Sequence, residues 1–187
     1  MPEWNRVKWT EAGQIAERLA WKEDLGEDSR AKPAAFFDKL IAAGRLSDAA
    51  FFLGQALPRY ETVAWATRAV RDLRTAPLPP GPEADAMKAA LLWVQDPSEP
   101  RRRTAFEIAG LAGDTSPERL VAFAAFFSGG SIAPADCPPV PSPQEAAGRF
   151  AAVAVLVAAA QSGDQPAGLN QALAAGRQIA EQGLGGG

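Results

Sequence analysis

The sequence predicts an all-α protein, a compact multi-helix bundle of about eight or nine helices with two proline-rich connectors. Apolar residues recur at helical spacing from end to end, whereas no run of β-branched and aromatic residues alternates with period two. Roughly 40 residues are alanine, which favours helix but adds little bulk. The core is therefore expected to depend on helices that approach one another closely.

Four helices are expected before the first connector. Thr10 opens one that fades at residues 26–29, and Pro33 suits the first turn of the second. Ser47 is a candidate N-cap for the third, and Arg59 begins the fourth. The second, third and fourth helices are expected over residues 33–44, 47–57 and 59–74.

Prolines at residues 75–82 cannot continue a helix, so this segment is a semi-rigid connector. Further helices are expected over residues 82–95, 98–113, 116–128 and 165–182, with a second proline-rich connector at 132–141. Ser142 and Glu145 have capping-box spacing before an apolar helix that ends near Gln161. We expect one domain over residues 1–187, with 1–76 and 82–182 as potential sub-halves and 183–187 as a flexible tail.

Composition excludes several classes of function. The chain has no histidine and one cysteine, Cys137, so imidazole catalysis, an internal disulfide and a multi-cysteine metal site are excluded. No catalytic, cofactor-binding or metal-binding residue is expected, and no cofactor. A net charge of −3 without a basic stripe argues against nucleic acid. The longest apolar run, residues 150–160, is shorter than the about 20 residues of a membrane span. Without a secretory signal at the amino terminus, a cytoplasmic location is expected.

The fourth helix carries the candidate partner-binding site. Val63, Ala66, Val70 and Leu73 form an apolar stripe, and a tryptophan among charged residues lies nearly opposite. That tryptophan fills a second helix contact in one interpretation, with Arg68 and Asp72 as an i,i+4 pair. In the other it anchors an exposed surface for an acidic or polar protein partner. The predicted partner-binding residues are Trp65, Arg59, Glu61, Arg68 and Asp72.

Two further features have structural interpretations. Arg101, Arg102 and Arg103 form the one basic run and are expected on a solvated face, with contact to an acidic partner or phosphate as the alternative. Trp4 and Trp9 precede the first clear helix. We expect these indoles to hold the amino-terminal segment on the body of the protein.

Two motifs carry a family resemblance. Residues 57–71 resemble a Leu-Pro-x-Arg-Glu-Ala-Val-Trp-Trp-like segment of an uncharacterised bacterial family, a domain of unknown function. Residues 126–134 resemble its Phe-x-Ser-Gly-Gly-Ser-x-Ala-Pro segment, with a proline-rich stretch after it. The chain departs at Tyr60 and at Ala64, where the family often has the first of two tryptophans. The resemblance implies an all-helical fold and genes lying near type VI secretion components, but no activity.

The sequence favours a non-enzymatic protein-protein interaction module, an accessory or adaptor of a bacterial secretion system, with an unknown protein partner. One alternative is a small-ligand binder or carboxylate-only enzyme with its site between the helical halves, which requires converging carboxylates. The other is a structural subunit that self-associates through its alanine-rich faces.

Overall fold

The computed structural model describes residues 3–134 and 136–185, and these form an all-α compact fold of nine α-helices without a strand. The predicted fold class is confirmed. One short 3-10 helix, η1, is added to the predicted elements. The helices are α1 (Ala12–Arg18), α2 (Pro33–Ala42), α3 (Leu46–Ala56), α4 (Arg59–Asp72), α5 (Pro82–Gln95), α6 (Glu99–Ala109), α7 (Pro117–Phe127), α8 (Ala146–Gln161) and α9 (Gln165–Gln182), and η1 spans Gly26–Arg30.

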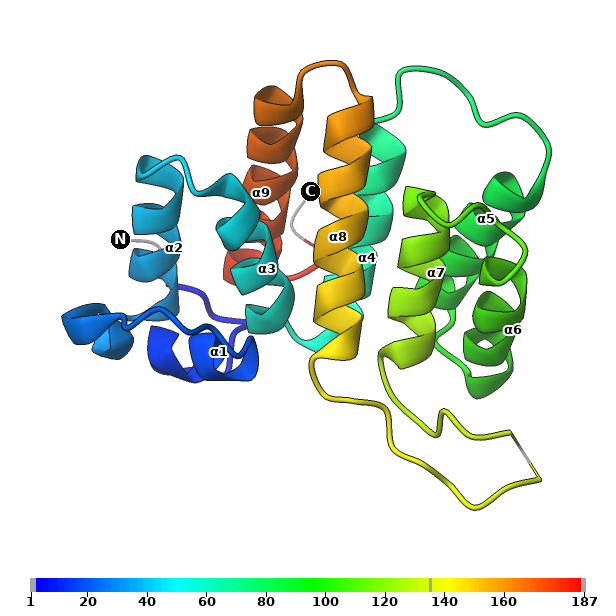
Figure 1. Ribbon diagram of the computed structural model, residues 1–187, viewed down its shortest axis with the longest axis horizontal. Coiled ribbons are helices and arrows are strands. Elements are labelled where there is room, and N and C mark those ends of the chain that lie inside the picture. The colour runs from blue at the N-terminus through cyan, green and yellow to red at the C-terminus, as the bar shows by residue number, and fades with distance from the viewer. Residues whose placement is uncertain (1–2, 135, 186–187) are drawn as a thin grey trace.

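Helices α4 and α8 stand side by side at the centre of the molecule, although 73 residues separate the end of one from the start of the other along the chain. Figure 1 shows α2, α3 and α9 on one side of this pair and α5, α6 and α7 on the other. The buried residues form a single hydrophobic cluster with members from both sides of the first connector. Both potential sub-halves thus contribute to one core.

Proline and polar caps determine several helix starts. Pro33, Pro82 and Pro117 occupy the first turns of α2, α5 and α7, where a missing amide hydrogen costs nothing. The Ser116 side chain accepts a hydrogen bond from the Arg119 amide, as expected of an N-cap. The expected bounds of α5 and α9 agree with the structure.

Two predicted serine caps are wrong. Arg45, and not Ser47, is the N-cap of α3, so Ser47 lies inside the helix. Helix α8 begins at Ala146, and the Ser142 hydroxyl instead donates a hydrogen bond to the Phe127 carbonyl (2.7 Å). This bond ties the end of the second connector to the end of α7.

The first helix is shorter than expected. Helix α1 ends at Arg18, and Ala20 adopts a positive φ of 55°, which a continuing helix does not allow. The chain then enters η1 within the segment where the periodicity fades. This early end places the Arg18 side chain at the tip of α1, where it takes part in the pocket described below.

Tryptophans hold the amino-terminal segment on the body, as expected. Trp4 is buried against Phe37, with ring centroids 5.2 Å apart. The Trp9 indole nitrogen donates to the Gln55 carbonyl at the end of α3 (3.0 Å). The predicted flexible tail lies partly outside the described residues, at 186–187.

Helices α3 and α8 approach closely at paired glycines. A Cβ atom added to Gly54 would lie 2.7 Å from the Gly148 carbonyl oxygen, and one added to Gly148 would lie 2.6 Å from the Gly54 carbonyl oxygen. Alanines from α3, α4, α5, α7 and α8 are fully buried in the core. Close approach of helices, expected from the alanine content, is therefore realised at the centre of the core.

The arginine run holds the second connector, so the expected solvated face is wrong for its central member. Arg102 is 4% exposed, and its guanidinium donates to the carbonyls of Phe126 (2.5 Å) and Ser131 (2.7 Å) and to Glu99. Arg103 donates to the Ala133 carbonyl (3.0 Å). These bonds compensate for the proline-rich connector's shortage of its own donors.

We predict that Arg102→Ala lowers the free energy of unfolding by about 2 kcal/mol, because two carbonyls and a carboxylate lose a charged donor. The connector should also be cut faster by a protease.

Hydrogen bonding to Arg102 lowers the pKa of Glu99. The bond between Arg102 and ionised Glu99 therefore stabilises the fold above the ordinary glutamate pKa, and this stabilisation is lost as the pH falls through the lowered pKa of Glu99. Between neutral pH and that acidic range, Arg102→Ala should therefore lose less stability than the wild type does. Urea titrations and limited proteolysis measure both effects, and Arg101→Ala is the control. Equal connector cleavage in the two variants would contradict the assignment.

No helix in residues 3–134 and 136–185 is long and apolar enough to cross a membrane.

Candidate functional site

The structure places Trp65 in the core, so its assignment as an exposed partner anchor is wrong. The side chain is 0% exposed, and its indole nitrogen donates to the Ala172 carbonyl of α9 (2.8 Å). Helix α4 packs against α5, α7, α8 and α9, which leaves little of its surface to solvent. The side opposite the predicted apolar stripe therefore faces another helix, which agrees with the structural interpretation.

The other predicted residues of α4 do not form one surface. Glu61 is buried and accepts a hydrogen bond from Arg6 (2.8 Å). Arg68 and Asp72 form the expected i,i+4 ion pair at 3.5 Å, exposed near the far end of the helix. Arg68 lies nine positions, about 14 Å of helix, after Arg59 at the start of α4. Of the five predicted residues, only Arg59 lines the pocket described next.

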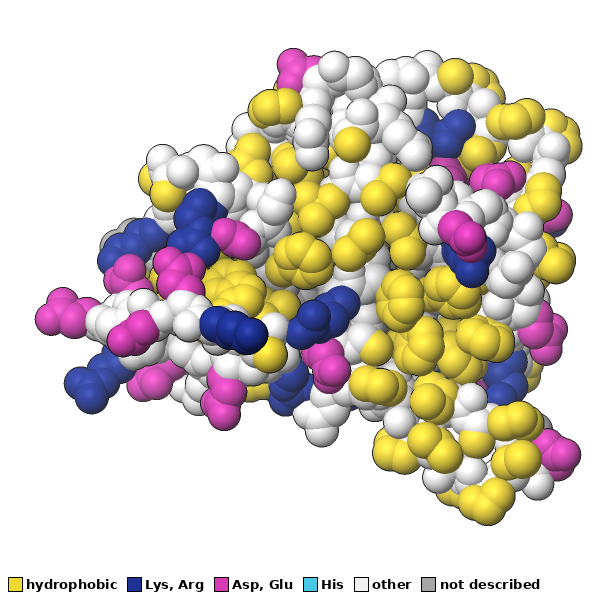
Figure 2. Space-filling view, viewed as in Figure 1, with side chains coloured by type: hydrophobic (Ala, Val, Ile, Leu, Met, Phe, Trp, Pro, Cys, Tyr) yellow, Lys and Arg dark blue, Asp and Glu magenta, His cyan; other side chains and the backbone are white. Residues whose placement is uncertain are grey.

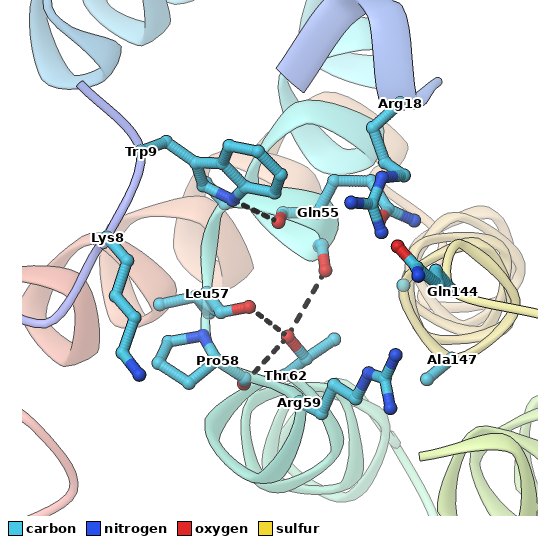
Figure 3. A pocket seen from close by; sticks show the side chains of 13 residues that line it. Lys8, Trp9, Arg18, Gln55, Leu57, Pro58, Arg59, Thr62, Gln144 and Ala147 are labelled. Atoms are coloured by element: carbon cyan, nitrogen blue, oxygen red, sulfur yellow. Dashed lines mark hydrogen bonds between the residues drawn. The ribbon is translucent and has the colours of Figure 1, made fainter. Parts of the chain in front are cut away.

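This pocket lies where five segments meet: the amino-terminal ends of α4 and α8, the carboxyl-terminal end of α3, the tip of α1 and the segment before α1 (Figure 3). Its volume is about 370 Å³. Leu57 and Pro58 provide part of an apolar wall, and Trp9 provides an indole. We call it the cationic pocket, after the side chains of Lys8, Arg18 and Arg59 that line it.

The three cations are placed around the opening. In Figure 3 the guanidinium groups of Arg18 and Arg59 lie on either side of Gln144, and the Lys8 ammonium group lies on the opposite side. The Arg18 guanidinium also lies over the Trp9 ring, 5.3 Å from its centroid. A ligand with more than one negative charge would meet a cation at each side.

These cations lack anionic partners within the described part of the chain. Most lysine and arginine side chains form ion pairs there, but Lys8, Arg18 and Arg59 form none, and no carboxylate lines the pocket. The Arg59 guanidinium makes one long bond, to the Ser128 carbonyl (3.4 Å). The pocket therefore carries uncompensated positive charge.

Side-chain donors bond to carbonyl groups at the end of α3 and in the turn after it, although the single hydrogen of a hydroxyl bonds to one carbonyl at a time. The Thr62 hydroxyl lies within hydrogen-bonding distance of the carbonyl oxygens of Gly54 (3.1 Å), Leu57 (3.2 Å) and Pro58 (3.1 Å). Trp9 takes the Gln55 carbonyl, as described above. The buried Gln55 amide group donates to the Glu145 carbonyl (2.7 Å), and this bond fixes the side chain at the pocket wall.

Two helix amino termini add to the positive potential. Pro58 and Glu145 are the N-cap residues of α4 and α8, and neither forms a side-chain cap bond. The first-turn amides of a helix carry partial positive charge. Glu61 in the first turn of α4 and Glu145 at the start of α8 do not line the pocket, so the three cationic side chains are the main reason that it suits negatively charged groups.

Sequence reasoning identified Arg59 but missed Lys8, Arg18 and Gln55. The three cations come from three segments, and each stands alone in the sequence without a basic neighbour of its own. No local spacing signal links them. Only the packing of the amino-terminal segment and α1 against the end of α3 brings them together.

Carboxylate catalysis and metal binding find little support among the described residues. The buried carboxylates there are Glu61, held by Arg6, and Glu118, held by Arg74 (2.7 Å) and the Ser116 hydroxyl (2.9 Å). They belong to separate ion pairs, and neither lines the cationic pocket. No group of three or more acidic or cysteine side chains in those residues is placed to hold a metal ion.

The family model described as a family of unknown function, DUF6931, matches residues 36–180. The chain belongs to this family. The match covers both motifs that carry the resemblance to a domain of unknown function, and that part of the resemblance is confirmed. The DUF6931 match assigns no activity and shows no link to secretion. No curated protein and no solved structure matches the chain.

Proposed function

We propose that this DUF6931 protein is a non-enzymatic interaction module that binds an acidic segment of a protein partner in the cationic pocket. The observation that carries the proposal is a pocket of about 370 Å³ lined by three cations and no carboxylate. The whole chain has a net charge of −3, so this local positive charge runs against the overall charge. Electrostatic complementarity of this kind directs a partner to one site and excludes partners of the wrong charge.

The separated positions of the cations favour an extended acidic segment over a single small anion. Lys8 lies across the opening from Arg18 and Arg59, so one carboxylate would leave part of the charge unpaired. The apolar wall and the Trp9 indole provide contact area for uncharged neighbours of the acidic residues. A component of a type VI secretion system remains a candidate partner on the strength of the sequence resemblance alone.

The test uses a fluorescent hexaglutamate peptide and measures its binding by fluorescence anisotropy. We expect the double variant Arg18→Gln/Arg59→Gln to bind the peptide at least about tenfold more weakly than the wild type, because two charge-assisted bonds are lost. Added salt should weaken wild-type binding steeply and the variant's binding less.

Arg30→Gln/Lys88→Gln is the matched control. Both residues are exposed, carry the same charges and, among the described residues, form no ion pair. This control should bind hexaglutamate within about twofold of the wild type. Equal loss of binding in both double variants would mean that net charge alone governs the affinity, and the proposal would be wrong. Absence of wild-type binding would have the same meaning.

A further inference from the structure

The outward face of α8 is apolar, which is unusual for a helix at the surface. Its half-buried and exposed positions recur at helical spacing, and only one of them carries a charge before Gln161. Figure 2 shows hydrophobic side chains gathered over this side of α8 and the neighbouring α7. The outward residues of α8 are Ala146, Arg149, Phe150, Val153, Leu156, Val157 and Ala160.

Aromatic side chains extend this surface across α7 to α6. Phe150 contacts Phe123 and Phe127, with ring centroids 5.4 Å and 5.1 Å apart. Phe123 in turn contacts Phe106 (5.8 Å), which is 44% exposed. We call the uncharged outward residues of α8 together with Phe106, Phe123 and Phe127 the apolar face. Contiguous exposed apolar area on a protein of this size marks an interaction surface.

The cationic pocket and the apolar face both involve the first turns of α8. Ala147 and Gly148, in the first turn of α8, line the pocket, and Phe150 follows at the start of the face. Arg149 lies between them as the one charged residue of α8, and its guanidinium donates to the Leu19 carbonyl beside Arg18 (2.8 Å). Charge is thus confined to the pocket end of a surface that is otherwise uncharged along α8.

We infer that the segment captured by this protein is an amphipathic helix of the partner whose acidic end enters the cationic pocket and whose apolar stripe lies along α8. The inference rests on the proposed function of the pocket. The charge distribution supports this occupant. The pocket end suits negative groups, and the rest of α8 has no charged side chain with which a charged partner could pair. A partner helix presents such an apolar stripe when its apolar residues recur at i, i+3, i+4 and i+7 spacing.

The helix dipoles indicate an orientation. The amino-terminal ends of α4 and α8 both reach the pocket. A partner helix whose carboxyl-terminal end enters the pocket would bring the negative end of its dipole against these positive ends. The bound helix then runs antiparallel to α8.

The experiment compares three fluorescent probes: hexaglutamate, a synthetic helical peptide of about 18 residues with leucine at i, i+3, i+4 and i+7 spacing and three glutamates at its carboxyl-terminal end, and the same peptide with glutamine in place of leucine. The wild type should bind the leucine peptide at least about tenfold more tightly than the other two. The variant Val153→Asp/Val157→Asp should lose this gain and retain hexaglutamate binding within about twofold. Thermal melts followed by circular dichroism verify that the variant is folded.

The two proposals fail in different ways. Equal binding of the leucine and glutamine peptides, with hexaglutamate still bound, overturns the amphipathic helix and leaves the pocket's proposed function intact. A folded face variant that keeps the full gain for the leucine peptide also overturns it, because the apolar contact must then lie elsewhere. If the wild type does not bind hexaglutamate, the proposed function of the pocket is itself wrong. The comparison of the two helical peptides needs no protein variant, so a variant that fails to fold does not prevent the test.

Discussion

Trp65→Ala is expected to lower the free energy of unfolding by about 3–5 kcal/mol, the usual cost of removing a fully buried aromatic side chain. Trp65 is 0% exposed and lies between α4 and α9, where its indole nitrogen bonds to the Ala172 carbonyl. A Cβ atom added to Gly176 of α9 would meet the Trp65 ring, so the two helices are fitted closely around it. In a domain of this length, the melting temperature should fall by roughly 2–4 °C for each kcal/mol.

Urea denaturation and thermal melts measure this loss. Trp65→Phe is the informative companion, because it keeps a six-membered ring in the core while it removes the donor to Ala172 and part of the indole. It should cost about 1–2 kcal/mol. A fully folded Trp65→Ala protein with wild-type stability would contradict the assignment of Trp65 to the core.

Gly54→Val is expected to lower the free energy of unfolding by about 3 kcal/mol or more, because the new side chain would collide with backbone and not with a movable side chain. The nearest atom to an added Cβ is the Gly148 carbonyl oxygen, at 2.7 Å. Glycine is itself a poor helix former, so the substitution would stabilise an isolated helix. The expected sign therefore depends entirely on the α3–α8 contact.

Gly129→Val is the matched control for the glycine substitution. An added Cβ there meets no atom within 4 Å, and the residue does not have a positive φ. Its free energy of unfolding should lie within about 0.5 kcal/mol of the wild type. If urea titrations give the same stability for both valine variants, the close approach of α3 and α8 is not a determinant of the fold.

The sequence allowed the architecture to be predicted because its signals are local. Pro82 and Gln95 bound α5 as expected, and Ser116 caps α7 through a side-chain bond. One of the two caps that failed has a distant partner. The hydroxyl of Ser142 bonds to Phe127, 15 residues earlier, and not to the helix that it was expected to start.

The candidate site was less predictable because long-range packing determines it. Periodicity places Trp65 opposite an apolar stripe, but it does not reveal that α9, 107 residues away, covers that side. Lys8, Arg18 and Arg59 are separated in the sequence and meet only after folding. The prediction of a solvated face for the arginine run was wrong for Arg102, although the three arginines are adjacent in the sequence. Arg102 is buried because the second connector, which has few donors of its own, packs over it.

Charge reversal tests whether Arg18 and Arg59 make the cationic pocket an acceptor for acidic groups. In Arg18→Glu/Arg59→Glu, the affinities for fluorescent hexaglutamate and hexalysine peptides are measured side by side with those of the wild type. The affinity of the reversed pocket for hexaglutamate should fall by at least about a hundredfold, because two charges are reversed, and the pocket should acquire an affinity for hexalysine that the wild type lacks. Unchanged binding of both peptides by the folded variant would contradict the claim that these side chains make the pocket an acceptor for acidic groups.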